Sequence, residues 1–146
     1  MILEHNGLGP LLDTLVRVTK TLLEKQGTFL PHGAMVLADG RVALVGAQTK
    51  EEQPGAQKEL LLLESGLRGM ATQGKCVAAG IALDTRLKAA PRQGDVGKDA
   101  IWAMLEHKDG TSISIFIPYA KTGSGIFAYG EAFQTPRKQT IFSAIQ

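Results

Sequence analysis

The chain has 146 residues, 44% of them hydrophobic and 21% charged, so its composition is that of a soluble globular protein with a single domain, residues 1–146. A net charge of +2 is too small to predict a polyanionic partner, and aromatic residues, at 5%, are too few for a nucleic-acid stacking platform. The single Cys76 excludes an intramolecular disulfide and any zinc site built from several cysteines. No apolar run approaches the ~20 residues of a membrane span, and residues 1–7 lack the features of a secretory signal, so a cytoplasmic location is expected.

The first predicted element is an amphipathic helix that opens at Gly9-Pro10 and stops at Gly27. Apolar side chains recur on it every three or four residues, at Leu8, Leu11, Leu15, Val18 and Leu22. Such a stripe is typical of a helix that packs on a sheet, and a partner helix is the alternative occupant.

Two hairpins are predicted, each with an Asp-Gly turn. The first joins strands at 34–37 and 41–46 through Asp39-Gly40, and the second spans residues 99–119 and turns at Asp109-Gly110. We expect two-residue type I′ turns, because these need positive φ at both central residues, which Gly adopts freely and Asp tolerates. Pro118 donates no ladder hydrogen bond, so it should end its strand or place it at an edge.

A second helix is predicted between the hairpins, at about residues 55–73, after a loop at 48–55. Its apolar side chains are Leu60, Leu61, Leu62, Leu63, Leu67 and Met70. This wide apolar surface predicts a helix that is largely buried or faces another subunit. Gly66 and Gly69 weaken a helix, and close packing against a neighbouring element would explain them.

The remaining elements complete an α+β domain. A strand is predicted at 75–87, with small residues on one face that suit a tightly packed helix, followed by a loop at 89–98. A flexible connection at 121–125 precedes a last strand at 126–133, and the segment after Pro136 is expected to be short and loosely held. The order α-β-β-α-β-β-β-β predicts a two-layer fold, in which two helices cover one face of an antiparallel sheet of about five to six strands.

This element order is similar to that of Roadblock/LC7 and profilin-like modules, which carry signals by binding partners. Short sequence words resemble a family of small bacterial α+β proteins that has no established activity. These words are Phe29-Leu30-Pro31-His32-Gly33, Ala38-Asp39-Gly40, Asp99-Ala100-Ile101, Glu106-His107, Asp109-Gly110 and Pro118-Tyr119. The resemblance covers most of the chain and implies no catalytic residue, cofactor or metal.

Polar side chains around the two hairpins form the candidate ligand or partner surface: His32, Glu106, His107, Tyr119 and Lys121. Glu106 and His107 are strand neighbours and should point to opposite faces, so they cannot act together as a general acid–base pair. The three histidines are too scattered for a local metal motif, and Cys76 should be a packed, inert thiol. We therefore predict no catalytic, cofactor or metal site.

Two functional hypotheses follow. The first is a non-enzymatic interaction or regulatory protein of the bacterial cytoplasm, which forms a homodimer or binds another protein. The alternative is a small-molecule-binding protein or enzyme with a pocket at the sheet rim, near the candidate residues.

Overall fold

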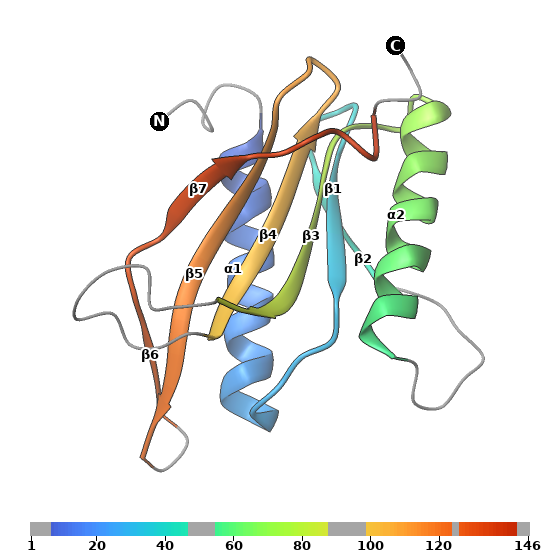
Figure 1. The fold of residues 1–146 in the computed structure, drawn as a ribbon. Coiled ribbons are helices and arrows are strands. Elements are labelled where there is room, and N and C mark those ends of the chain that lie inside the picture. The colour runs from blue at the N-terminus through green and yellow to red at the C-terminus, as the bar shows by residue number, and fades with distance from the viewer. Residues whose placement is uncertain (1–6, 47–54, 88–98, 124–125, 143–146) are drawn as a thin grey trace.

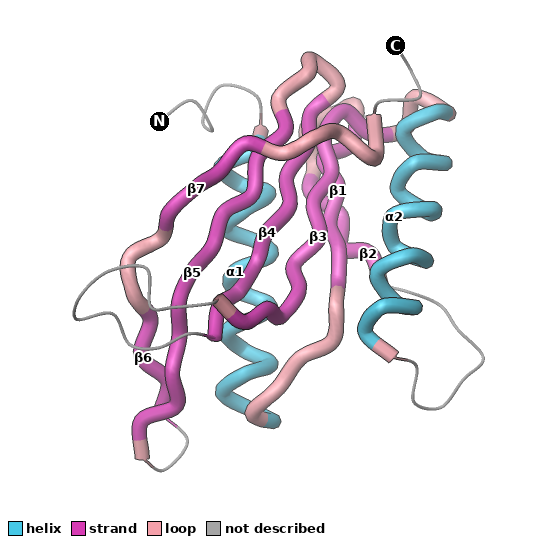
Figure 2. Tube along the Cα trace, viewed as in Figure 1, coloured by secondary structure: helices cyan, strands magenta, loops and turns pink. Residues whose placement is uncertain are grey.

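The computed structural model describes residues 7–46, 55–87, 99–123 and 126–142 (Figure 1). Within them lie two helices, α1 (Leu8–Gln26) and α2 (Ala56–Thr72) (Figure 2). The strands are β1 His32–Leu37, β2 Val42–Val45, β3 Cys76–Arg86, β4 Asp99–His107, β5 Ser112–Thr122, β6 Ile126–Tyr129 and β7 Phe133–Pro136. The loop predicted at 89–98, and all but the last residue of the loop predicted at 48–55, lie outside the described residues.

The strands form one open antiparallel sheet in the order β2-β1-β3-β4-β5-β6, and β7 also pairs with β5. The predicted α+β class and element order are confirmed. The predicted last strand is divided in two, because β6 pairs with residues 119–122 and β7 pairs with residues 113–116 of the same strand β5. The sheet therefore has seven strands where five to six were expected.

Pro118 lies inside β5 and does not end it, since the strand continues to Thr122. The carbonyl of Pro118 accepts the N–H of Gly130 at 2.8 Å. The N–H and C=O of a strand residue point to the same side, so the position where Pro118 lacks an N–H faces the break between β6 and β7. No ladder donor is needed at that break, which is why proline is tolerated there. Lys121, predicted to lie in a flexible connection, is also part of β5.

Both Asp-Gly turns differ from the predicted type I′ geometry. The Leu37 N–H donates to the Arg41 carbonyl at 2.8 Å, which closes a three-residue loop, and the second hairpin repeats this bond between His107 and Thr111. Only the glycines have positive φ, 93° at Gly40 and 104° at Gly110. Each turn is therefore a three-residue loop with a glycine of positive φ in its third position, so the aspartate does not need a positive φ.

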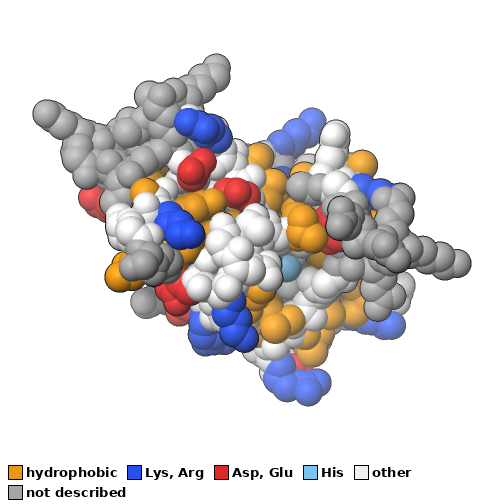
Figure 3. All heavy atoms as spheres, turned by 90° about the horizontal axis from the view of Figure 1, so that it is seen from below, with side chains coloured by type: hydrophobic (Ala, Val, Ile, Leu, Met, Phe, Trp, Pro, Cys, Tyr) orange, Lys and Arg blue, Asp and Glu red, His pale blue; other side chains and the backbone are white. Residues whose placement is uncertain are grey.

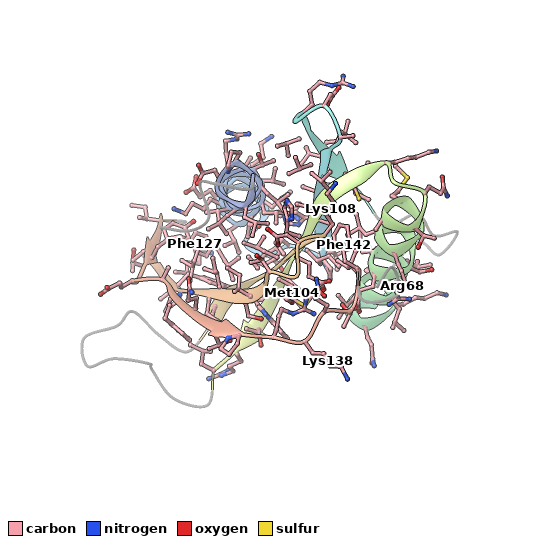
Figure 4. All side chains as sticks on the ribbon, turned by 90° about the horizontal axis from the view of Figure 1, so that it is seen from above. Arg68, Met104, Lys108, Phe127, Lys138 and Phe142 are labelled. Atoms are coloured by element: carbon pink, nitrogen blue, oxygen red, sulfur yellow. The ribbon has the colours of Figure 1, made fainter. Side chains whose placement is uncertain are left out.

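The two helices pack against opposite faces of the sheet (Figure 4), whereas the sequence placed them on one face. Ala34 and Val36 of β1 contact the leucines of α1, and Met35 between them packs with Leu63 and Leu67 of α2. The central strands are apolar on both faces, so each face needs a cover. Helix α1 buries Leu8, Leu11, Leu15, Thr19 and Leu23.

The small face of β3 lies under α1, as predicted. A Cβ atom at Gly80 would come within 2.8 Å of side-chain atoms of Leu15 and Leu105 and within 3.0 Å of the Met104 carbonyl oxygen. Glycine is therefore required here, because α1 and β4 both approach the β3 backbone closely. The tight packing of α1 on the sheet depends on this one position.

Helix α2 buries less of its apolar surface than predicted. Leu63 and Leu67 are buried, but Leu61 and Leu62 are exposed to 61% and 36%. A Cβ atom at Gly66 or Gly69 would have no atom within 4 Å. Close packing within the described residues therefore does not explain these glycines, and their cost to helix stability is uncompensated there.

Candidate functional site

The five residues predicted to form a ligand or partner surface do not share one face. Cross-strand partners lie on the same face, so His107, opposite Ala78, belongs to the α1 face, and Glu106, opposite Ala79, belongs to the α2 face. Glu106 and His107 are thus separated by the sheet, as strand alternation predicts.

The remaining candidates lie on the α1 face. Tyr119 pairs with Asp99, at the opposite end of β4 from Glu106, and Lys121 follows it in β5 as an exposed side chain. His32, at the start of β1, contacts Thr19 of α1. The candidate residues therefore belong to separate local environments.

Glu106 has the most highly organised environment of the five, because its carboxylate is fully buried and accepts hydrogen bonds at both oxygens. The backbone N–H groups of Thr140 and Ile141 each donate at 2.9 Å, and that of Phe142 donates at 3.1 Å. The Thr140 hydroxyl donates at 3.1 Å, and the Arg137 guanidinium forms an ion pair with the same carboxylate. Every donor comes from residues 137–142, which we call the C-terminal clasp.

These donors decide the ionisation of Glu106. Burial alone raises the pKa of a carboxyl group, but the N–H groups of the clasp and the Arg137 guanidinium outweigh it and lower the pKa of Glu106 below its usual value. The side chain is therefore a buried carboxylate that holds one segment of the chain. Its lone pairs are used internally, so we assign it a structural role.

The C-terminal clasp is firmly packed, and the prediction of a loosely held end is wrong for it. Ile141 and Phe142 are 1% and 2% exposed and lie with Met104 between the sheet and α2 (Figure 4). Arg68 of α2 donates to the Thr140 carbonyl at 2.9 Å. An acidic residue directly after the apolar run Ala100 to Leu105 was the sequence signal for a buried partner, and the Ile141-Phe142 pair was the signal for core packing.

His32 joins α1 to the start of β1. Its Nδ1 lies 3.1 Å from the Leu30 carbonyl oxygen, so this nitrogen donates, and its Nε2 lies 3.0 Å from the Thr19 hydroxyl. Its ring also packs edge-on against Phe29. Both ring nitrogens are occupied within the chain, which makes His32 a structural connection.

His107 stabilises its own turn. The Asp109 N–H donates to His107 Nδ1 at 2.9 Å, and the Asp109 carboxylate in turn accepts the Thr111 N–H at 2.9 Å. Gln139 of the clasp donates to the His107 carbonyl at 3.1 Å. Only His107 therefore fits the interpretation of Glu106-His107 as polar residues that flank an exposed turn, because Glu106 is fully buried.

Tyr119 and Asp84 form a hydrogen bond that crosses β4. The Tyr119 hydroxyl donates to Asp84 Oδ1 at 2.7 Å, over the side chain of Ile101. Burial and the neighbouring carboxylates, Asp84 first, raise the pKa of Tyr119 well above its usual value, and burial raises the pKa of Asp84. Tyr119 therefore stays protonated and acts as a donor that ties β5 to β3.

We expect Tyr119→Phe to lower the free energy of unfolding by about 1 kcal/mol, because it removes one hydrogen bond and keeps the ring. Asp84→Asn retains an acceptor oxygen and should cost less, and the double variant should cost no more than Tyr119→Phe. Urea unfolding followed by circular dichroism measures all three. An unchanged stability of Tyr119→Phe would contradict the structural role of this bond.

The α2 face of β4, β5 and β7 carries a row of aromatic side chains. The Trp102 and Phe116 rings stack at 5.5 Å between centroids, and Phe116 stacks on Phe133 at 5.2 Å. Trp102 Nε1 donates to the Ser114 hydroxyl at 2.8 Å. Ser114 of β5 therefore lies beside these rings and is buried.

The described residues offer little to metal or redox chemistry. Among them, no three histidine, cysteine or acidic side chains gather closely enough to hold a metal ion. Cys76 is buried, and burial raises the pKa of its thiol, as expected of an inert packed cysteine. Neither described helix has the length and apolarity needed to cross a membrane. Acidic and basic side chains are interspersed on the face shown in Figure 3.

Comparisons with protein-family models, with curated proteins and with solved structures found no match for this chain. The resemblances drawn from the sequence therefore stay predictions.

Proposed function

We propose that the protein is a non-enzymatic interaction protein of the cytoplasm that acts as a homodimer, and that two copies pair through the edge strand β2. The observation that carries the proposal is the chemistry of this edge. All four residues of β2 are apolar, and Leu44 is 61% exposed. Within the described residues, β2 pairs only with β1.

Natural edge strands are usually protected by lysine, proline, a bulge or a covering element. Strand β2 contains neither lysine nor proline. Its nearest charge, Arg41, is held by Asp39 in its own turn, with Nε 2.7 Å from Oδ2. At the other end of the sheet, β6 and β7 occupy the outer side of β5. Among the described residues, β6 is the edge strand at that end, and it is also apolar, with Ile126 64% exposed, so an apolar edge is not unique to β2.

The backbone of β2 suits antiparallel pairing with a second copy. The bond between Leu37 and Arg41 sets the ladder so that Ala43 and Val45 bond to β1, which leaves the N–H and C=O groups of Val42 and Leu44 pointing outward. Two such strands, related by a two-fold axis at Ala43, would place Val42 opposite Leu44 of the other copy. This pairing covers the exposed leucine and satisfies the outward groups.

The exposed leucines of α2 support a protein partner over a small molecule. Leu61 and Leu62 lie on the helix that packs over β1 and β3, next to the β2 edge. Leu44, opposite Ala34, belongs to the α1 face, so Leu61 and Leu62 form a separate apolar surface on α2, and exposed leucines of this kind are typical of protein contact surfaces.

The test is the mass in solution. We expect light scattering at micromolar concentration to give twice the mass of one chain, and Leu44→Lys to give a monomer, because a charge on the edge opposes pairing. Leu30→Lys is the matched control, since Leu30 is also exposed, to 49%, but lies outside β2. A monomeric wild-type protein, or a Leu44→Lys variant that remains dimeric, would contradict the proposal.

A further inference from the structure

The described residues cover the α1 face of the sheet only in part, and a groove runs beside the helix. Helix α1 packs mainly on β1, β3 and β4, so the sheet extends past it at β5. A hollow of about 500 Å³ lies between α1 and Ile117, and one of about 150 Å³ lies over Ile115 near Gln134. Both hollows are lined by Leu12, so they lie next to each other along α1, and we call them together the groove.

The shape of the groove suits a helix. Ile117 of β5 forms its floor, next to the buried Ile115, and Leu12 and Val16 form the wall on α1. Strand β6 contacts α1, and Lys20 Nζ lies 4.3 Å from the centre of the Tyr129 ring, so a second helix would lie along the outer side of the groove, over Ile117. A helix also satisfies its own backbone hydrogen bonds, which an apolar floor cannot do for an extended or irregular segment. From Leu12 to Glu24 the lining spans about 18 Å of α1, roughly three turns.

Charged side chains mark the upper rim of this groove. Asp13, Arg17, Lys20 and Glu24 all line it, and their spacing of four, three and four residues places them on one side of α1. The rim therefore has negative charges at its two ends and positive charges in its middle. In the described part of the chain, no ion pair joins Asp13 to Arg17.

This charge order argues against a second copy of α1 as the occupant. Paired antiparallel and in register, two α1 helices would place Asp13 opposite Glu24 and Arg17 opposite Lys20, and parallel pairing would place each charge opposite itself. Both arrangements set like charges together, which selects against the pairing. A complementary helix has acidic residues in its middle and basic residues at its ends.

We infer that the groove between α1 and β5 binds an amphipathic helix of a different protein, whose apolar side packs on Leu12, Val16 and Ile117 and whose acidic centre pairs with Arg17 and Lys20. The surface is separate from the β2 edge, so this inference does not depend on the homodimer. It gives the protein a second contact surface, through which a dimer would hold two copies of its partner.

The test uses two synthetic peptides of about 15 residues, long enough for three to four helical turns. Both have the same leucine stripe. Beside this stripe, the acid-centred peptide has glutamates in its middle and lysines at its two ends. The other peptide has lysines in its middle and glutamates at its ends. Fluorescence anisotropy measures their affinity, and ¹⁵N chemical-shift changes locate the contact. The protein variants are Arg17→Glu with Lys20→Glu, and, as a control of equal charge, Lys25→Glu with Lys108→Glu, which lie outside the groove.

We expect the wild-type protein and the control variant to bind the acid-centred peptide at least about tenfold more tightly than its counterpart. Arg17→Glu with Lys20→Glu should reverse this order, and Leu44→Lys should leave it unchanged. Absence of binding at several hundred micromolar, equal affinity for both peptides, or shift changes outside α1 and β5 would overturn the inference. If the ¹⁵N chemical shifts of groove residues changed with protein concentration in the absence of peptide, the groove would bind a second copy of the chain, and the inference would be overturned as well.

Discussion

Replacing Glu106 with alanine is expected to lower the free energy of unfolding by roughly 3–5 kcal/mol, the range for removing one partner of a buried ion pair. The change leaves the Arg137 guanidinium and the N–H groups of Thr140, Ile141 and Phe142 without their acceptor in a water-poor site. Urea unfolding measures the loss. Glu64→Ala on α2 is the control, because it removes a less buried glutamate and should cost under 1 kcal/mol.

Glu106→Gln separates charge from shape. The amide has nearly the same size as the carboxylate, but its NH₂ group faces hydrogen-bond donors of the clasp. We therefore expect the free energy of unfolding to fall by more than about 1 kcal/mol but by less than in Glu106→Ala. A Glu106–Arg137 double-mutant cycle should show a coupling free energy well above zero. Full stability of Glu106→Gln, or a cycle without coupling, would show that the clasp is held by Ile141 and Phe142 alone.

The same carboxylate predicts a pH dependence of stability. The folded pKa of Glu106 lies below its usual value of 4.5, so the unfolded chain takes up the proton first as the pH falls. The stabilisation by Glu106 is therefore complete above about pH 4.5 and is lost as the pH falls through the folded pKa. We expect Glu106→Gln to have a shallower loss of stability in this acidic range than the wild-type protein. Equal slopes would contradict a depressed pKa at this site.

Gly80→Ala is the second substitution with a large expected effect. Its Cβ would lie 2.8 Å from methyl groups of Leu15 and Leu105, which have some freedom to move, and 3.0 Å from the Met104 carbonyl oxygen, which has little. We expect a loss of about 1–3 kcal/mol, as for other overpacked cores, and a larger one for Gly80→Val. Thermal and urea unfolding both report it.

Gly69→Ala provides a control of opposite sign. This glycine lies within α2, and apart from the helix's own backbone no atom of the described residues lies within 4 Å of the position that a Cβ would take. Alanine should therefore stabilise the protein by about 0.5–1 kcal/mol through its higher helix propensity. If both substitutions changed stability in the same direction, the close approach of α1 to β3 would not be the cause of the Gly80 effect.

Local patterns were sufficient for most of the element boundaries. The leucine spacing on α1 and the glycine after it predicted a helix that the structure has at Leu8–Gln26, with Gly27 as its cap. The alternation in residues 99–119 predicted β4 and β5 and separated Glu106 from His107. These features depend on residues a few positions apart, so the sequence carries them directly.

Long-range features needed the structure. The bonds that hold Glu106 join residues 31 to 36 positions apart, and no local pattern specifies them. The face chosen by α2 also could not be predicted, because Met35 and the residues beside it are apolar on both sides of the strand. Pro118 can lie inside β5 because β6 ends and β7 begins opposite it. The sequence did not predict this break, which depends on how both strands pair with β5.

By itself, therefore, the sequence determined the α+β class, the element order, the alternating faces of the strands and the buried thiol, because periodicity and turn residues act over a few positions. Only the tertiary structure decided which surfaces remain open. The β2 edge, the exposed leucines of α2 and the groove beside α1 exist because two helices cover only part of a seven-stranded sheet. That outcome depends on how distant elements pack, and it is where we place the function of the protein.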